Sequence, residues 1–396
     1  MFSLETVGFL LTDFNSVYIL SEITNYIFVV LILMMLTHFN FLDRQLFVFW
    51  LFYLSTPLFI NYIIFQPGYM GDQASYLEEI NKSISLGFGI LDGLEVTNLS
   101  SIIAYKVRIA SLALSSIPMF SYLSVTSIAF INKLIALVLF VYLSRRIDPK
   151  KLIYFFLVPS FILYSSVGLR DCLIISCATV ALVSLLERKI ILSLIFLVFV
   201  SVIKLQFAPG LIIAWLLMFL VRADLSFKRY LLSTIVGVFG VVIFFDVYAE
   251  YLNIYRLAFA IEDCYGGYLA CKDVDPNELK ISSGLELIWL SIISLPEFML
   301  RPLPWEISGI FKLLIFVESL ILSIALAFFI FSRKVYLQNN FWIVFTGFFV
   351  TFSLLAITAF NIGTLSRYRF EILWPFLIAF YYASKRNEYS RKELEA

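Results

Sequence analysis

Hydrophobic residues make up 61% of this 396-residue chain, charged residues only 14%, and the formal net charge is +1. Soluble domains carry roughly 25% charged residues, and one soluble core could not hide this much apolar surface. The composition therefore excludes an ordinary soluble domain, and the near-neutral charge argues against a nucleic-acid partner, which would need a basic face. Lipid is the expected solvent, and the expected fold is an all-α polytopic membrane protein.

Apolar runs long enough to cross a bilayer, about 17–25 residues each, occur about eleven times along the chain. They lie at residues 15–37, 45–65, 128–144, 152–169, 171–187, 189–205, 206–221, 230–249, 307–332, 341–361 and 369–384. No linker, repeat or low-complexity stretch separates them. Residues 1–396 are therefore predicted to form a single transmembrane domain.

Basic residues gather in alternate connections between these runs. They are Arg44; Arg145, Arg146, Lys150 and Lys151; Arg188 and Lys189; Arg222, Lys228 and Arg229; Arg333 and Lys334; and Lys385, Arg386, Arg391 and Lys392. The positive-inside rule places these connections in the cytoplasm. The N-terminus is then outside and the C-terminus inside.

Two larger loops, residues 66–127 and 250–306, are predicted on the outer side. Within them, residues 102–123 and 285–300 are apolar but fit poorly as spans, and we interpret both as interfacial or re-entrant helices. Cys264 and Cys271 lie in the second loop. They would form a disulfide if that loop faces an oxidising periplasm, and two free thiols fit the sequence equally well.

Several basic residues lie at span ends on the predicted outer side, where the orientation rule depletes them. They are Arg170, Lys204, Arg301, Arg367 and Arg369. Converging guanidinium groups suit phosphate oxygens, which they bind bidentately. A phosphate at that depth suggests a lipid-linked phosphate or diphosphate. The alternative is that each cation reaches lipid headgroups or pairs with a nearby acid such as Asp171, Glu306 or Glu371.

Asp72, at the start of the first outer loop, is the best candidate for a general base, because a carboxylate at a site mouth can deprotonate a sugar hydroxyl. Its turn-rich surroundings fit a purely structural role equally well. Asp171, Glu297 and Glu306 are weaker candidates. Two further charges lie inside apolar runs, Lys133 and Glu318. They could line a cavity or pair with each other.

Some kinds of chemistry are disfavoured. The single histidine, His38, falls at the predicted cytoplasmic end of the first run, so no histidine would act on the outer side. The sequence has no metal-ligand spacing and no Asp-x-Asp motif, so no catalytic metal or other cofactor is expected. It also lacks a glycine-rich phosphate loop, which disfavours ATP-driven transport.

Four short motifs, together with the many spans, resemble the Wzy-type polymerases of bacterial surface polysaccharides. The motifs are Gly-Asp-Gln-x-x-Tyr at 71–76, Pro-Ser at 159–160 followed by Gly-Leu-Arg-Asp at 168–171, Arg-Pro-Leu-Pro-Trp-Glu at 301–306, and Asn-x-Gly-Thr-Leu-x-Arg-Tyr-Arg at 361–369. The resemblance extends from about residue 66 to 375. The motifs are short and of modest specificity.

The resemblance implies a glycosyltransferase at the periplasmic face of the bacterial inner membrane. It would move a growing glycan from undecaprenyl diphosphate onto the terminal sugar of a new lipid-linked repeat unit, with a chain-length regulator protein as a further partner. The diphosphate would be stabilised by the five outer basic residues. Asp72 would activate the acceptor hydroxyl. Tyr76, Trp305 and Tyr368 would contact sugars, although aromatics at an interface also act as anchors.

Two other functions fit parts of the sequence. A single-sugar transferase using a polyprenyl-phosphate sugar also begins an outer loop with an acidic residue, but usually after the first span, whereas Asp72 follows the second. A lipid-linked-oligosaccharide flippase would carry charges through its helix interiors, where mainly Lys133 and Glu318 are found. The related O-antigen ligases depend on an outer histidine, and the position of His38 argues against that activity.

Overall fold

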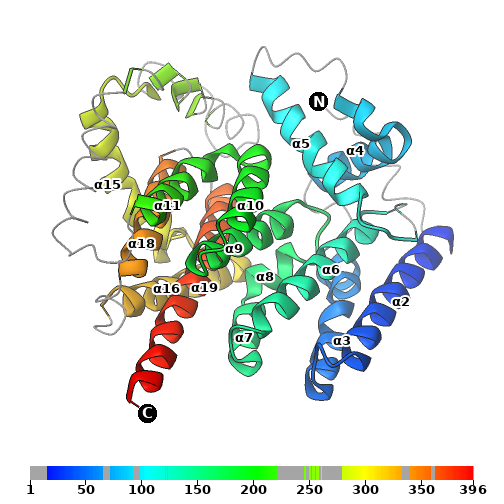
Figure 1. The fold of residues 1–396 in the computed structure, drawn as a ribbon. Helices are drawn as coiled ribbons and strands as arrows, with labels where there is room; N and C mark the ends of the chain where they lie inside the picture. The colour runs from blue at the N-terminus through cyan, green and yellow to red at the C-terminus, as the bar shows by residue number, and fades with distance from the viewer. Residues whose placement is uncertain are drawn as a thin grey trace. The chain divides into compact units, whose positions relative to one another are not determined.

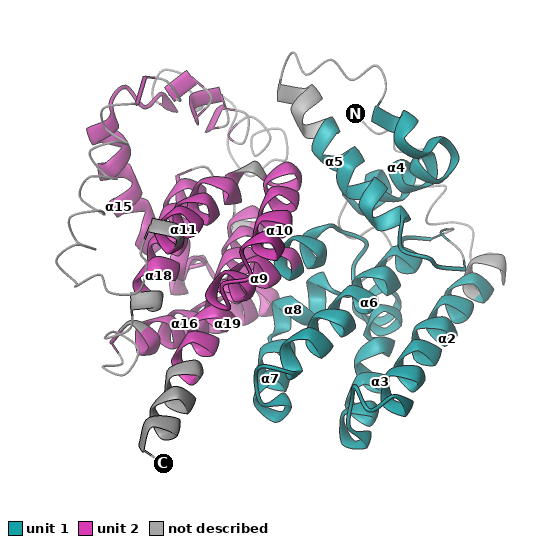
Figure 2. Cartoon of the chain, in the orientation of Figure 1, with its two compact units in different colours: residues 1–176 teal, residues 177–396 magenta. Residues whose placement is uncertain are grey.

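The structure, a computed structural model, is all-helical in the residues that it describes (Figure 1). These are residues 16–65, 72–91, 99–120, 122, 124–220, 245–246, 249–250, 252–254, 256–257, 260, 279–331, 339–357 and 362–395. The chain divides into two compact units, residues 1–176 and 177–396, with the division inside one helix, α9 (Asp171–Leu186) (Figure 2). The predicted all-α class is confirmed for the described part of the chain.

The first unit is built from two long apolar helices packed on a third, with a helical hairpin beside them. Its elements are α2 (Ser16–His38), α3 (Arg44–Phe59) continued by a π-helical turn η1 (Ile60–Ile64), α4 (Asp72–Leu86), a 3-10 turn η2 (Gly87–Leu91), α5 (Leu99–Ser115), α6 (Val125–Ser144), α7 (Pro149–Phe156) and α8 (Pro159–Tyr164). α2, α3 and α6 contact one another, and α4 packs against α5. Within the predicted stretch 102–123 the structure has α5, which ends at Ser115 and is one arm of a hairpin; its interfacial or re-entrant position stays a prediction.

The core of the first unit is aromatic. Trp50 lies 5.2 Å from Phe140 and 5.8 Å from Phe156, measured between ring centroids, and Phe156 lies 4.8 Å from Phe161. All four rings are almost fully buried. Edge-to-face aromatic pairs contribute roughly 0.5–1.5 kcal/mol each beyond their buried area. This cluster fixes α3, α6, α7 and α8 against one another.

Four helical stretches among the described residues are long and apolar enough to cross a membrane. They are Leu20–His38, Arg44–Ile64, Val125–Ser144 and Ile310–Phe329. Inside the first unit, 78% of the Val125–Ser144 stretch is buried, against 28% and 33% of the other two, so α6 is the central helix and α2 and α3 present apolar faces outward. Four further apolar helices are shorter, namely Asp171–Leu186, Ile190–Ile203, Ala208–Met218 and Trp342–Ala356.

The second unit is organised around the long helix α19 (Ile362–Glu395). The other elements are α10 (Ile190–Ile203), a 3-10 turn η3 (Leu205–Phe207), α11 (Ala208–Leu220), α15 (Gly284–Leu300), a 3-10 turn η5 (Pro304–Glu306), α16 (Ile310–Phe331) and α18 (Asn339–Ala356). α15, α16 and α18 all contact α19, whose residues Phe370, Trp374 and Phe376 are buried to 1% exposure or less. The predicted helix at 285–300 is α15.

α11 and α18 approach each other through glycines. A Cβ atom added at Gly347 would lie 2.7 Å from the carbonyl oxygen of Gly210 and 2.8 Å from Cβ of Ala214. One added at Gly210 would overlap Thr351 Oγ1 and the Gly347 carbonyl oxygen. Small residues four apart on both helices, Gly210 with Ala214 and Gly347 with Thr351, allow the close packing that is typical of membrane helix pairs.

The predicted run at 152–169 is not one helix. α7 ends at Phe156, α8 begins at Pro159, and residues 165–170 between α8 and α9 are not helical (the α8–α9 segment). Proline has no N–H to donate and disfavours helical geometry at the residue before it, here Val158, which is extended. The run predicted at 230–249 falls mostly outside the described residues, and Cys264 and Cys271 fall entirely outside them.

Replacing Gly210 with leucine should separate α11 from α18, because its side chain has no space between the helices. Overpacking of this kind costs roughly 1–3 kcal/mol or more. Thermal denaturation in detergent, followed by size-exclusion chromatography, should show a clearly lowered midpoint. Gly309→Ala is the matched control, because a Cβ there meets no atom within 4 Å and its midpoint should stay unchanged. Equal midpoints for the two variants would contradict the close packing.

Candidate functional site

The predicted site residues fall into two sets, one in each unit. Asp72, Tyr76 and Arg170 belong to the first unit. The second unit holds Lys204, Arg301, Trp305, Arg367, Tyr368 and Arg369. Within each unit, two of the sequence motifs meet.

In the first unit, the start of α4 lies against the α8–α9 segment, about ninety-five residues further along the chain. The side-chain oxygen of Gln73 accepts a hydrogen bond of 2.7 Å from the backbone N–H of Gly168. The guanidinium of Arg170 lies 6.0 Å from the ring centre of Tyr76. Asp72, the first residue of α4, is exposed beside them. Asp72, Tyr76 and Arg170 thus lie in one region of the first unit.

The α8–α9 segment is buried although it is not helical, so its backbone needs hydrogen-bond partners from elsewhere. Asn132 of α6 donates from one amide group to the carbonyl oxygens of Val167 and Leu169, at 2.7 Å each. Asn61, in the π-helical turn that ends α3, donates to the carbonyl oxygen of Ser166 at 2.9 Å. Side chains from three helices therefore hold this segment in place.

Lys133 belongs to the same network and is fully buried. Its ammonium donates to Ser165 Oγ at 2.8 Å and lies 3.8 Å from the ring centre of Tyr53, whose hydroxyl also contacts Ser165 at 3.1 Å. A charge at this depth is costly in lipid and marks function by default. The sequence places Lys133 inside an apolar run but does not reveal which residues it contacts. Glu318, the other charge that the sequence places inside an apolar run, belongs to the second unit.

Glu22 of α2 is a feature that the sequence analysis did not single out. It is 2% exposed, and its two carboxylate oxygens accept hydrogen bonds from Tyr62 at 2.5 Å and from Ser124 at 2.6 Å. Tyr62 lies in the π-helical turn, and such turns are frequent at functional sites. The signal available in the sequence was a lone carboxylate near a span end.

In the second unit, Arg369 joins α19 to the end of α15. Its guanidinium donates to the backbone carbonyl oxygens of Phe298 at 3.0 Å, Met299 at 3.1 Å and Arg301 at 2.6 Å. The last carbonyl groups of a helix have no partner within the helix, and a cation there also matches the helix dipole. Arg369 therefore caps α15, and it brings the two motifs at 301–306 and 361–369 together.

Arg301 pairs with Glu306 across a tight turn that begins with a cis Arg301–Pro302 peptide bond. Its Nε and Nη2 lie 2.8 and 2.7 Å from Glu306 Oε1, while Glu306 Oε2 accepts the Leu303 N–H at 2.8 Å. Burial raises the pKa of the Glu306 carboxyl, but the hydrogen bonds from Arg301 and Leu303 outweigh burial and leave the pKa below its ordinary value. Glu306 is therefore an ion-pair partner and a poor base.

Lys204, at the end of α10, forms a buried ion pair with Glu371 of α19. Its ammonium also lies 3.5 Å from the ring centre of Tyr368. Tyr368 and Glu371 are three residues apart and so lie on one face of the helix. The sequence offered Glu371 as a possible partner for one of the basic residues. The structure pairs it with Lys204.

The remaining residues of this set are more accessible. Arg367 is half-buried and lies two residues before Arg369, about 200° around α19 at 3.6 residues per turn. Trp305 is 80% exposed in the turn η5. A tryptophan so exposed fits either a sugar contact or an anchor at the membrane interface. In the second unit, α19 thus gathers Lys204, Arg301 and Arg369 around its first turns.

In the described part of the chain, no group of three histidine, cysteine or carboxylate side chains could hold a metal ion. No protein-family model, curated protein or solved structure matches this chain. The site must therefore be interpreted from its own geometry.

Replacing Gln73 with leucine should release the α8–α9 segment, because the buried Gly168 N–H would lose its acceptor. An unsatisfied buried donor costs about 1–3 kcal/mol. The thermal midpoint in detergent should fall, while Ser75→Ala, a half-buried change on the same helix, should leave it unchanged. If the two variants melt together, Gln73 does not hold this segment.

Proposed function

We propose that this chain is a glycosyltransferase that polymerises undecaprenyl-diphosphate-linked oligosaccharide repeat units at the periplasmic face of the bacterial inner membrane. The observation that supports it best is that the four motifs behind the resemblance meet in pairs. The Gln73–Gly168 hydrogen bond joins the first pair, and the contact of Arg369 with the carbonyl of Arg301 joins the second. Such contacts are what the resemblance leads one to expect if the motifs contribute to shared sites.

The proposed reaction is a transfer of a glycosyl group between two lipid-linked substrates. The acceptor hydroxyl oxygen forms a bond with the anomeric carbon of the growing glycan, and the bond from that carbon to the diphosphate oxygen breaks. The proton of the hydroxyl passes to Asp72, and undecaprenyl diphosphate leaves with the electron pair. Basic side chains stabilise the charge that develops on the leaving diphosphate.

The contacts suggest a division of labour among the basic residues. The Arg369 guanidinium donates to three backbone carbonyls, and Lys204 is paired with Glu371. We therefore assign both residues to positioning α15 and α19. We assign direct contact with phosphate oxygens to Arg170 in the first unit and to Arg367 in the second, with Arg301, which is paired with Glu306, as a further candidate in the second unit. Tyr76, Tyr368 and Trp305 are the proposed sugar contacts.

The finer topology is part of the same proposal. It has about eleven spans, an outer N-terminus, an inner C-terminus and two outer loops at 66–127 and 250–306. The helical hairpin of α4 and α5 fills the first of these loops and carries Asp72 at its start. An amphipathic hairpin on the outer surface would place this carboxylate where lipid-linked sugars arrive.

Substitutions at the proposed site should separate chemistry from folding. Arg170→Ala and Arg367→Ala should each abolish glycan extension while the protein still inserts and purifies normally, and Asp72→Asn should do the same. Lys151→Ala, an exposed change on the predicted cytoplasmic side, is the control and should extend glycans like the wild type. Wild-type extension by both arginine variants would rule out the diphosphate site, and normal extension by Asp72→Asn would rule out this base.

Deleting the gene in its bacterial host should distinguish the polymerase from its two alternatives. A polymerase deletion leaves lipid A capped with a single repeat unit, as seen on a silver-stained lipopolysaccharide gel. Loss of all capping would indicate a flippase, and a ladder whose units lack one sugar would indicate the single-sugar transferase.

A further inference from the structure

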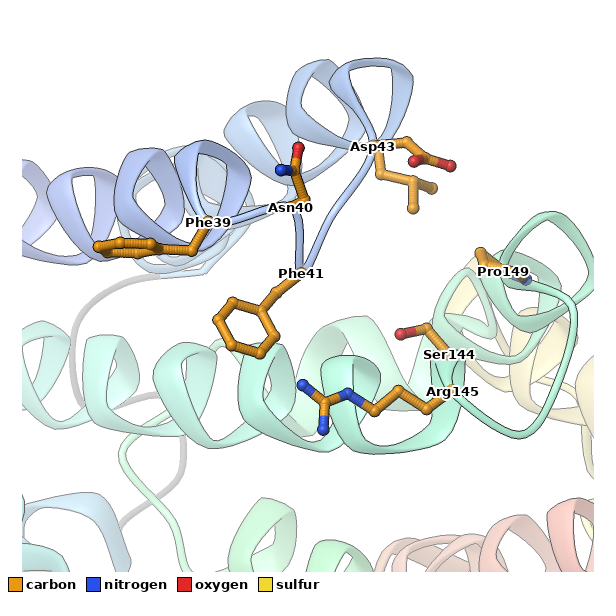
Figure 3. A pocket seen from close by; sticks show the side chains of 8 residues that line it. Phe39, Asn40, Phe41, Asp43, Ser144, Arg145 and Pro149 are labelled. Atoms are coloured by element: carbon orange, nitrogen blue, oxygen red, sulfur yellow. The ribbon is translucent and has the colours of Figure 1, made fainter.

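A cleft of about 270 Å³ opens in the first unit, between the turn that joins α2 to α3 and the turn that joins α6 to α7 (Figure 3). Its lining residues are Phe39, Asn40, Phe41, Asp43, Leu46, Ser144, Arg145 and Pro149. A water molecule in the liquid occupies roughly 30 Å³, so the cleft could hold a group of several heavy atoms. None of these residues takes part in the proposed glycosyl transfer.

The position of the cleft along the helices is informative. Three of the four helical stretches long enough to cross a membrane have an end here, at His38, Arg44 and Ser144. These three helices also contact one another. The end of an apolar span marks the boundary between hydrocarbon and headgroups. The cleft therefore lies at headgroup level, and the basic residues of these turns place it on the cytoplasmic side.

An apolar surface leads from the cleft toward the hydrocarbon. Phe39 and Phe41 at its rim are 61% and 43% exposed, and Leu31, Met34 and Met35 of α2 are each at least half exposed. Acyl chains could lie along this face of α2 while a headgroup occupies the cleft. The arrangement fits an amphipathic ligand better than a free ion.

The positive charge of the cleft lining comes from Arg145. Its side chain is exposed, and its guanidinium carbon lies 4.9 Å from the ring centre of Phe41 (Figure 3). No ion pair between described residues involves Arg145. A guanidinium that contacts an aromatic ring still has N–H groups available for phosphate oxygens.

The surroundings decide the preferred sign of the ligand. Asp43 also lines the cleft, and Asp148 lies close to Arg145 in the sequence. These two turns and the first residues of α3 and α7 carry more basic residues than acidic ones, namely Arg44, Arg145, Arg146, Lys150 and Lys151. Juxtamembrane basic residues attract anionic lipids of the cytoplasmic leaflet. A net negative headgroup is therefore favoured over a zwitterionic one.

We propose that this cleft binds the headgroup phosphate of an anionic glycerophospholipid in the cytoplasmic leaflet, with Arg145 as the phosphate ligand and Ser144 beside it. The binding site rests on the proposed membrane orientation but on none of the residues proposed for glycosyl transfer, so lipid binding and glycosyl transfer can fail separately.

Native mass spectrometry of the full chain in detergent, titrated with phosphatidylglycerol, tests the site. Arg145→Gln should weaken the tightest lipid adduct roughly tenfold or more, as expected for hydrogen bonds to a charged group. Arg44→Gln removes the same charge from an exposed residue that does not line the cleft, and it should change the affinity less than twofold. Asp43→Asn should raise the affinity at least twofold, because it removes a carboxylate beside the phosphate.

Several results would overturn the proposal. Unchanged binding by Arg145→Gln would show that Arg145 does not bind the phosphate. An equal loss of affinity with Arg44→Gln would mean diffuse electrostatic attraction without a defined site. A failure of Asp43→Asn to raise the affinity would place the phosphate elsewhere. Displacement of the lipid by millimolar inorganic phosphate would mean a soluble ligand, and equally tight binding of phosphatidylethanolamine would contradict the preference for anionic lipids. All variants alter exposed side chains, and an unchanged thermal midpoint would verify their folding.

Discussion

Backbone groups away from water must find hydrogen-bond partners within the protein, and this requirement shapes the first unit more than any other. The α8–α9 segment leaves the helical conformation while buried, so several of its N–H and carbonyl groups bond to side chains of other helices. Asn61, Asn132 and Gln73 supply them from η1, α6 and α4. The π-helical turn η1, helix α6 and the start of the α4–α5 hairpin all bond to this irregular stretch. It is also the stretch that carries Arg170.

In the second unit the same problem has a different solution, because the end of α15 is capped by an arginine of another helix. The sequence predicted that Arg369 binds substrate, but in the structure its guanidinium links α19 to α15. Lys204 is likewise paired, with Glu371. Charges inside a membrane protein are expensive, so they are seldom left to one role. A site built on such residues has rigid surroundings, which favours a fixed geometry for a reacting group.

The sequence predicted well what depends on local pattern and poorly what depends on distant pairing. The apolar runs at 15–37, 45–65 and 307–332 correspond closely to α2, to α3 with η1, and to α16. The count of about eleven spans stays a prediction. Gln73 was noted only as part of a motif and Glu22 was not singled out, because nothing in the chain near Gln73 or Glu22 reveals Gly168 or Ser124 as a partner. Similarly, the run at 152–169 looked continuous because its apolar character hides the break before Pro159.

The buried position of Lys133 has a consequence for the order in which the protein is assembled. The ribosome makes α6 before it makes Ser165, so Lys133 enters the membrane without its hydrogen-bond acceptor. Inserting a lysine at the centre of a lone helix costs about 2.5–3.5 kcal/mol on translocon scales. Tyr53 has already been synthesised by then, and its ring faces the ammonium in the finished fold. Early docking of α6 on α3 would thus shelter the charge from lipid until the α8–α9 segment arrives.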